Sequence, residues 1–191
     1  MKDKILDKIR RNRPEAEVAI FIPSNACCAP DCINSFTSTV ENIGATIVRC
    51  SNDNEIIGEI KARHPNAKRI INTIPSLDMD SLEISSIPDA KALHPLDLSI
   101  VQGDFGVVEN GAIWINHASL PMRAIPFIAE HLVILLSEDN IVSDMHEAYA
   151  RLEEDTADYG VFIAGPSKTA DIEQCLVVGA QGAKSLLVIL I

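Results

Sequence analysis

The chain has 191 residues, of which 47% are hydrophobic and 23% are charged, a composition typical of a globular protein with one sizeable core. Its formal net charge of −11 argues against nucleic acid or an anionic membrane surface as a partner, because phosphate groups would not be neutralised. No apolar run approaches the roughly 20 residues of a membrane-spanning helix. The charged amphipathic start of the chain also differs from a secretory signal, so we expect a cytoplasmic protein.

Helical and strand patterns alternate along most of the chain. Helices are predicted over residues 1–10, 35–43, 54–63, 123–130 and 141–153. Strands are predicted over residues 45–50, 69–74, 98–101, 131–136, 159–164 and 185–191. Residues 18–22 are expected to form another strand or a short apolar connector. Residues 76–95, rich in Ser, Asp and Pro, are expected to form an irregular surface segment with a short helical piece.

The order of these elements indicates the fold class. Alternating apolar strands and amphipathic helices are typical of a mainly parallel sheet covered by helices. One exception is the pair Asn110-Gly111 between two β-like runs, the strongest short signal for an antiparallel hairpin. We therefore predict a single domain over residues 1–191, with a three-layer α/β/α sandwich and a mainly parallel sheet. Ligands of such sheets bind beyond the carboxyl ends of the strands.

The last part of the chain is predicted to form a strand, a turn, a helix and a strand. The turn is Gly165-Pro166-Ser167, at the carboxyl end of the strand over residues 159–164. Thr169, or Ser167 before it, is a good helix N-cap, and the acidic residues that follow suit the positive end of a helix dipole. This order predicts a βαβ unit that ends in the buried strand over residues 185–191.

Residues 165–173, with the sequence GPSKTADIE, form a contiguous motif. It resembles the GPS-basic-TADIE signature of the LutC (YkgG) family of LUD-domain lactate-utilisation proteins. Two weaker matches follow the family order, in residues 109–112 and in Arg123, Pro126 and His131. The resemblance covers residues 98–191, and the first half of the chain matches only in its layout of elements.

This resemblance implies a fold, a function and partners. The fold would be that of the NagB/RpiA/CoA-transferase-like α/β proteins. The function would be a role beside two iron–sulfur proteins in the oxidation of L-lactate to pyruvate. The chain itself is then expected to hold no cofactor, because the clusters belong to the partner subunits, and to bind a small carboxylate or an anionic ligand.

Ser167, Lys168 and Thr169 are candidates for an anion site. Backbone N–H groups at a helix start, two hydroxyls and one ammonium suit a carboxylate or a phosphate. Asp171 is close enough to the turn to orient Lys168 or Ser167. The alternative is a capped helix with a solvated lysine, and the family match favours the site.

Glu109 is the candidate catalytic residue. The string Glu-Asn-Gly resembles the segment around the nucleophilic glutamate of class I CoA-transferases, which would attack an acyl-CoA and form a mixed anhydride. The alternative is that Asn110-Gly111 is a type I′ turn and that Glu109 only flanks it. The turn explains the Asn-Gly pair better than a three-residue motif does, and it is the favoured interpretation.

Three further residues are candidates for binding, namely Asn110 beside Glu109, Arg123 and His131. Arg123 could clamp a carboxylate with two hydrogen bonds or lie at the surface. His131 precedes a buried strand and could face the same cleft as Glu109, or it could be an ordinary satisfied histidine. The other four histidines are assigned no role.

The cysteines predict neither a metal site nor a disulfide framework. Cys27, Cys28 and Cys32 are clustered, but their spacing fits no common ligand pattern for zinc or iron–sulfur centres. The total of five is odd, which favours reduced thiols. We therefore expect no metal to be bound by this chain.

Overall fold

The computed structural model describes residues 4, 8, 31–153, 159–170, 176–179 and 182–191. The predicted strand or connector over residues 18–22 lies outside the described residues, as does the first predicted helix apart from Lys4 and Lys8. The elements are α2 (Asp31–Asn42), β1 (Thr46–Arg49), α3 (Asp53–Arg63), β2 (Ile70–Asn72), η1 (Ile84–Ser86), η2 (Ala90–Leu93), β3 (Leu98–Gln102), β4 (Phe105–Val107), β5 (Ile113–Asn116), η3 (His117–Ser119), α4 (Ile125–Ile128), β6 (His131–Leu136), β7 (Ile141–Val142), α5 (Met145–Glu153), β8 (Gly160–Ile163), β9 (Lys168–Ala170), β10 (Leu176–Val178) and β11 (Ser185–Leu190).

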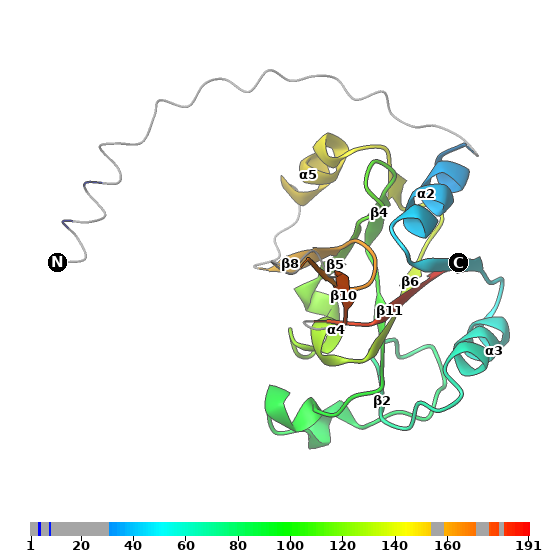
Figure 1. The fold of residues 1–191 in the computed structure, drawn as a ribbon, viewed down its shortest axis with the longest axis vertical. Helices are drawn as coiled ribbons and strands as arrows, with labels where there is room; N and C mark the ends of the chain where they lie inside the picture. The colour runs from blue at the N-terminus through cyan, green and yellow to red at the C-terminus, as the bar shows by residue number, and fades with distance from the viewer. Residues whose placement is uncertain (1–3, 5–7, 9–30, 154–158, 171–175, 180–181) are drawn as a thin grey trace.

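A five-stranded parallel sheet forms the centre of the molecule (Figure 1), with the strand order β1-β11-β6-β3-β2. Its middle strands, β11 and β6, are the two unbroken apolar runs of the sequence, and all their residues after the first are buried. Strands covered on both faces need this composition. The prediction of an α/β fold with a mainly parallel sheet is confirmed.

The two faces of this sheet carry separate apolar clusters. In β6, Val133 belongs to the cluster that contains Ile60 of α3. Its neighbour Ile134 belongs to the cluster that contains Phe36 of α2. Adjacent residues of a strand point to opposite faces, so this alternation places α3 on one side of the sheet and α2 on the other. Each such side chain that is fully buried contributes about 1.5–3 kcal/mol.

A second sheet holds the antiparallel hairpin that the sequence predicted. Its strand order is β7-β4-β5-β8, and β4 pairs antiparallel with β5. The hairpin is thus not part of the main sheet. Phe105, Val107 and Val142 of this sheet cluster with Ala148 of α5, so α5 covers one of its faces. Gly106 lies against α2 and β6, because a Cβ atom there would stand 2.8 Å from Phe36 and 2.9 Å from Leu136.

The hairpin loop is wider than the two-residue turn that Asn110-Gly111 predicted. The pairing of Gly106 with Ile113 continues to the Val107 N–H, which donates to the Ala112 carbonyl, so four residues form the loop. Gly111 has a φ of +68° and donates its N–H to the Val107 carbonyl. The pairing of β4 with β5 ends at Val107 because the N–H groups of the next two residues donate to the carbonyls of Val142 and Ser143.

The predicted helix after the Gly165 turn is wrong where the structure describes it. Lys168–Ala170 forms β9 and Leu176–Val178 forms β10, and the two strands pair antiparallel. The residues between them, 171–175, lie outside the described part. Long-range backbone bonds override the local cap signals, since the Ser167 N–H donates to the Ala183 carbonyl and the Ser167 carbonyl accepts from Gly179.

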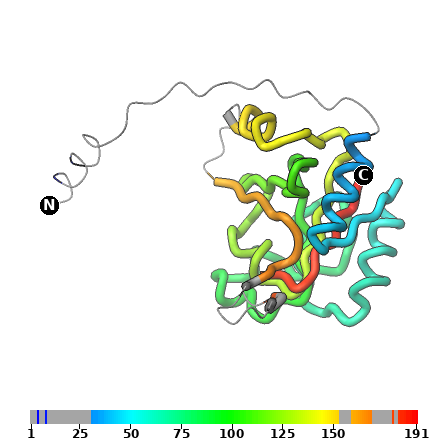
Figure 2. The backbone as a smooth tube through the Cα atoms, turned by 45° about the horizontal axis from the view of Figure 1, so that its top comes forward, coloured from blue at the N-terminus to red at the C-terminus, as the bar shows by residue number. Residues whose placement is uncertain are grey.

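The end of the chain is also not a βαβ unit. β8 pairs antiparallel with β5 in the four-stranded sheet, whereas β11 lies between β1 and β6 in the main sheet. The orange segment with β8 and the red segment with β11 can be followed separately in Figure 2. The start of the helix predicted over residues 141–153 also differs. Ile141–Val142 forms β7, which pairs parallel with β4, and α5 begins only at Met145.

Two further findings concern the membrane and the cysteines. None of the described helices combines the length and the apolar character that crossing a membrane requires. Cys32 takes part in a disulfide, so the expectation of reduced thiols is wrong at this residue. Cys27 and Cys28 lie outside the described residues. Cys50 is a free buried thiol whose pKa is raised by burial and by the nearby acidic side chains of α3.

Candidate functional site

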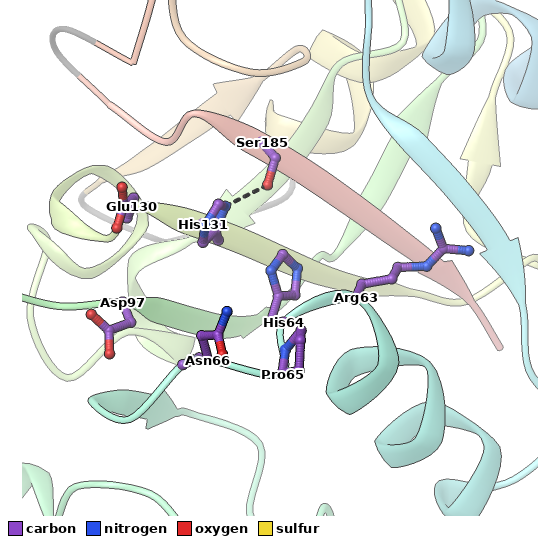
Figure 3. A pocket seen from close by; sticks show the side chains of 9 residues that line it. Arg63, His64, Pro65, Asn66, Asp97, Glu130, His131 and Ser185 are labelled. Carbon is purple, nitrogen blue, oxygen red and sulfur yellow. Dashed lines mark hydrogen bonds between the residues drawn. The ribbon is translucent and has the colours of Figure 1, made fainter.

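A cavity of about 310 Å³ lies where β3, β6 and β11 begin, beside the end of α3 (Figure 3). We call it the His64–His131 cavity. Its polar lining residues are Arg63, His64, Asn66, Asp97, Glu130, His131 and Ser185. It therefore lies at the amino ends of the parallel strands, whereas the sequence led us to expect a site beyond their carboxyl ends.

Strand register brings His131 and Ser185 together. They are the first residues of β6 and β11, and they stand opposite each other in the parallel pairing. Two residues later in each strand come Val133 and Leu187, which both pack on the α3 face. Because strand side chains repeat every second residue, His131 and Ser185 share that face. Their Nδ1 and Oγ atoms are 2.7 Å apart and hydrogen-bonded.

His64 covers this pair from the end of α3. Its backbone N–H donates to the Ile60 carbonyl at 2.9 Å, and Pro65 then prevents the helix from continuing. The rings of His64 and His131 pack with centroids 4.7 Å apart and planes inclined by 37°. The Nε2 atom of His64 is buried and has no hydrogen-bond partner.

The environment of His64 favours its neutral form. Burial lowers the pKa of this imidazole below its ordinary value of 6.5, and the adjacent His131 and the Arg63 guanidinium lower it further. All three causes penalise a positive charge on the ring. His64 is therefore neutral at physiological pH and can accept or share a proton.

The two acidic groups of the cavity already have partners. The Asp97 carboxylate accepts the backbone N–H groups of Arg69 and Lys68 at 2.9 and 2.7 Å, and these bonds lower its pKa. The Glu130 carboxylate pairs with the Lys184 ammonium, which lowers the pKa of Glu130. Figure 3 shows both acids on one side of the cavity and Arg63 on the other, with the imidazoles between them.

This arrangement can hold a small anion and exchange a proton with it. The guanidinium of Arg63, the hydroxyl of Ser185 and the amide of Asn66 are donors, and a neutral imidazole can donate or accept. A second cavity, of about 460 Å³, shares Asp97 and Glu130 with the first and is also lined by Lys184. Within the described part of the chain, no three His, Cys, Asp or Glu side chains are grouped so as to hold a metal ion.

The GPSK segment, residues 165–168, does not line the His64–His131 cavity. Lys168 donates from Nζ to the carbonyl of Ile43, just beyond the end of α2. A cation suits this position, since the last carbonyls of a helix lack partners. Ser167 packs against Gly182 and uses its backbone for the bonds described above. Thr169 belongs to β9, and Asp171 lies outside the described residues.

Glu109, Asn110 and Arg123 also lie outside the lining of the His64–His131 cavity. The Glu109 carboxylate accepts the N–H of Met145 at 2.9 Å and so caps the start of α5. Asn110 uses its side-chain oxygen to accept the N–H of Ala112 within the hairpin loop. The Arg123 guanidinium stacks 4.5 Å above the ring of Tyr159. Their functional roles stay predictions.

Of the candidate residues that lie in the described part of the chain, His131 is the one that lines this cavity. His64 and Ser185 were missed. The sequence holds a weak signal for His64, because a histidine between a helical stretch and a proline marks a helix end. No signal identifies Ser185, whose partner His131 is 54 positions away in the chain.

Comparisons with known proteins agree with the resemblance seen in the sequence. The LUD domain family model matches residues 33–191. Lactate utilization protein C of Bacillus pumilus is 33% identical over 90 residues, which cover 44% of this chain and 38% of that protein. Lactate utilization protein C of Geobacillus kaustophilus is 30% identical over 97 residues, covering 48% and 40%. These alignments span at most two fifths of the curated relatives.

A solved structure supports the fold. The crystal structure of a DUF162 family protein from Deinococcus radiodurans superposes with a TM-score of 0.65 at 22% identity, covering 84% of this chain and 96% of that one. At this identity the likeness concerns the fold alone. Since the LUD model matches well over half of the chain, this protein belongs to the LUD domain family.

Proposed function

We propose that this chain takes part in L-lactate utilisation and binds a small carboxylate in the His64–His131 cavity. The relatives named lactate utilization protein C support the first part. The second part rests on one observation, a cavity of about 310 Å³ where two imidazoles and a serine hydroxyl meet and which Arg63, bonded through Nε to Glu59, also lines.

The chemistry of a 2-hydroxy carboxylate fits this lining. Its carboxylate would lie toward Arg63 and the imidazoles, because Asp97 and Glu130 occupy the other side of the cavity. Its hydroxyl would lie beside Nε2 of His131, since Nδ1 of that ring is bonded to Ser185. Only the hydrogen bonds to the ligand carboxylate would be charge-assisted, and such bonds are about twice as strong as neutral ones.

The finer part of the proposal concerns the assembly. Oxidation of lactate to pyruvate releases two electrons, and we infer from the resemblance to the LutC family that iron–sulfur partner subunits accept them. We propose that this chain supplies the carboxylate site and that its partners supply the electron acceptor.

Isothermal titration of the purified chain with L-lactate tests the binding. We expect saturable binding that the substitution His131→Gln weakens about tenfold, the loss of roughly one hydrogen bond. His146→Gln is the matched control, because His146 is exposed on α5 and does not line the cavity. Absence of binding to the wild-type chain, or equal affinity in both variants, would contradict the proposal.

A further inference from the structure

We propose that carboxylate binding is coupled to the uptake of a proton by the His64–His131 pair, so that the cavity takes up a monocarboxylate together with one proton. This inference rests on the proposed function of the cavity and deepens it. The bound anion and the proton together carry no net charge, as in the neutral acid. The negative charge stays on the ligand, and the positive charge lies on an imidazolium.

The geometry of the pair limits it to one proton. With ring centroids 4.7 Å apart, two imidazolium charges would repel each other strongly in a half-buried place. The spacing of the rings therefore leaves room for one positive charge on the pair. Ser185 can adapt to either state, because its hydroxyl donates to an unprotonated Nδ1 of His131 or accepts from a protonated one.

Charged groups of both signs surround the pair, and the surroundings of His64 disfavour a proton on its ring while the cavity is empty. The basic groups are Lys61 and Arg63 of α3, Lys68 after it and Lys184 before β11. The acidic groups are Asp97 before β3, Glu130 before β6, Asp80 on the far side of His64, and Glu59 of α3, which accepts a hydrogen bond from Nε of Arg63 at 3.0 Å. The carboxylates of Asp97 and Glu130 are engaged by backbone N–H groups and by Lys184. Burial of the ring is the largest influence against a proton on His64, followed by the adjacent His131 and then by Arg63.

A bound carboxylate would favour a proton on the His64–His131 pair. An anion within a few ångströms of an imidazole favours the protonated ring and raises its pKa. By linkage, a ligand that raises the pKa of a group binds with proton uptake and binds more tightly as the pH falls. The affinity for the carboxylate should therefore decrease by up to about tenfold per pH unit on the alkaline side of the transition.

Calorimetry separates this coupling from binding itself. L-lactate is titrated into the full chain at about pH 6 and about pH 8, the range that spans histidine titration. Each titration is repeated in two buffers of different ionisation enthalpy. We expect the observed heat to depend on the buffer in the sense of proton uptake, and the affinity to be higher at the lower pH. The double variant H64Q/H131Q should lose both effects, and the control H146Q should keep them.

The outcomes distinguish the two proposals. If L-lactate binds with the same affinity at both pH values and with buffer-independent heat, the coupling is overturned and the carboxylate site stands. If L-lactate binds at neither pH, the proposed function and the coupling fail together. If H146Q loses the proton uptake as the double variant does, the proton resides elsewhere and the assignment to the pair is wrong. The wild-type buffer comparison decides the matter even if a variant folds poorly.

Discussion

The buried Nε2 of His64 is the most informative single atom in the molecule. It has no hydrogen-bond partner, and an unsatisfied buried polar atom costs about 1–3 kcal/mol. The ring also lies beside another imidazole and an arginine, which makes its charged form unfavourable. Trp114 Nε1 and His117 Nδ1 are also buried without a partner, so the His64 atom supports this cavity as the site only together with its place in the cavity lining.

His64 should make the stability of the empty protein depend on pH. Its pKa is lowered in the folded state, so the unfolded chain binds the proton more readily once the pH falls below about 6.5. The free energy of unfolding should then decrease as the pH falls from 6.5 toward the folded pKa, and level off below it. Urea denaturation at several pH values measures this slope. His64→Gln should flatten it, and an unchanged slope in that variant would show that another group is responsible.

Glu109 offers a second test at the residue scale. Its carboxylate caps α5 through the Met145 N–H, so Glu109→Ala should lower the free energy of unfolding by about 1 kcal/mol. Glu109→Gln keeps an acceptor oxygen and should cost about half of that, the charge–dipole part. The same Gln variant tests the nucleophile hypothesis. Any turnover of an acyl-CoA by the wild-type chain must disappear in E109Q, and retained turnover would exclude Glu109 as nucleophile.

Residue roles could be predicted from the sequence only in part. His131 was a candidate because it begins an apolar strand. The partners that give it a function, His64 and Ser185, come from α3 and β11, and only the pairing of β6 with β11 brings them together. Strand order in a parallel sheet is set by long-range packing, and a single sequence contains little direct information about it.

At the scale of elements, local signals succeeded where the tertiary structure supports them. Helix α3 begins where Asn52 caps it, with its side chain accepting the Glu55 N–H while Glu55 reaches back to the Ser51 N–H. The apolar runs of β6 and β11 were equally clear. The signals failed at Lys168–Ala170, because pairing with β10 satisfies the backbone better than a helix start does there.

Two glycines test how the elements pack. Gly106→Ala should lower the free energy of unfolding by about 1–3 kcal/mol, because the new methyl group would push against Phe36 and Leu136 where α2 meets β6. Gly58→Ala is the matched control. Gly58 is exposed in α3 with open space around the new Cβ atom, so this change should stabilise by about 0.5–1 kcal/mol. Denaturant melts of both variants measure the difference, and equal effects would contradict the described packing.

At the scale of the whole molecule, the two sheets have different roles. The parallel sheet positions the His64–His131 cavity at its amino edge, and the four-stranded sheet joins it through α2 and carries α5. The fold class was predictable, since it follows from the alternation of elements. The separation into two sheets was not, because β4, β5 and β8 have patterns that would fit either sheet.

The proposed assembly gives a prediction at the same scale. A tagged copy of the chain, recovered from its own cells grown on L-lactate, should bring down brown partners that absorb visible light as iron–sulfur proteins do. Cells grown on another carbon source are the control and should yield less of these partners. A colourless chain recovered alone from lactate-grown cells would contradict the assembly and leave the carboxylate site to be judged by its own tests.

The most direct test of the carboxylate site is a side-chain NMR titration of the histidines with L-lactate. The chain has five histidines, and variants of each assign their imidazole signals. We expect the signals of His64 and His131 to shift together and saturate, while that of His146 on α5 stays unchanged. Saturable shifts confined to other histidines, or no shift at all, would show that the His64–His131 cavity is not the carboxylate site.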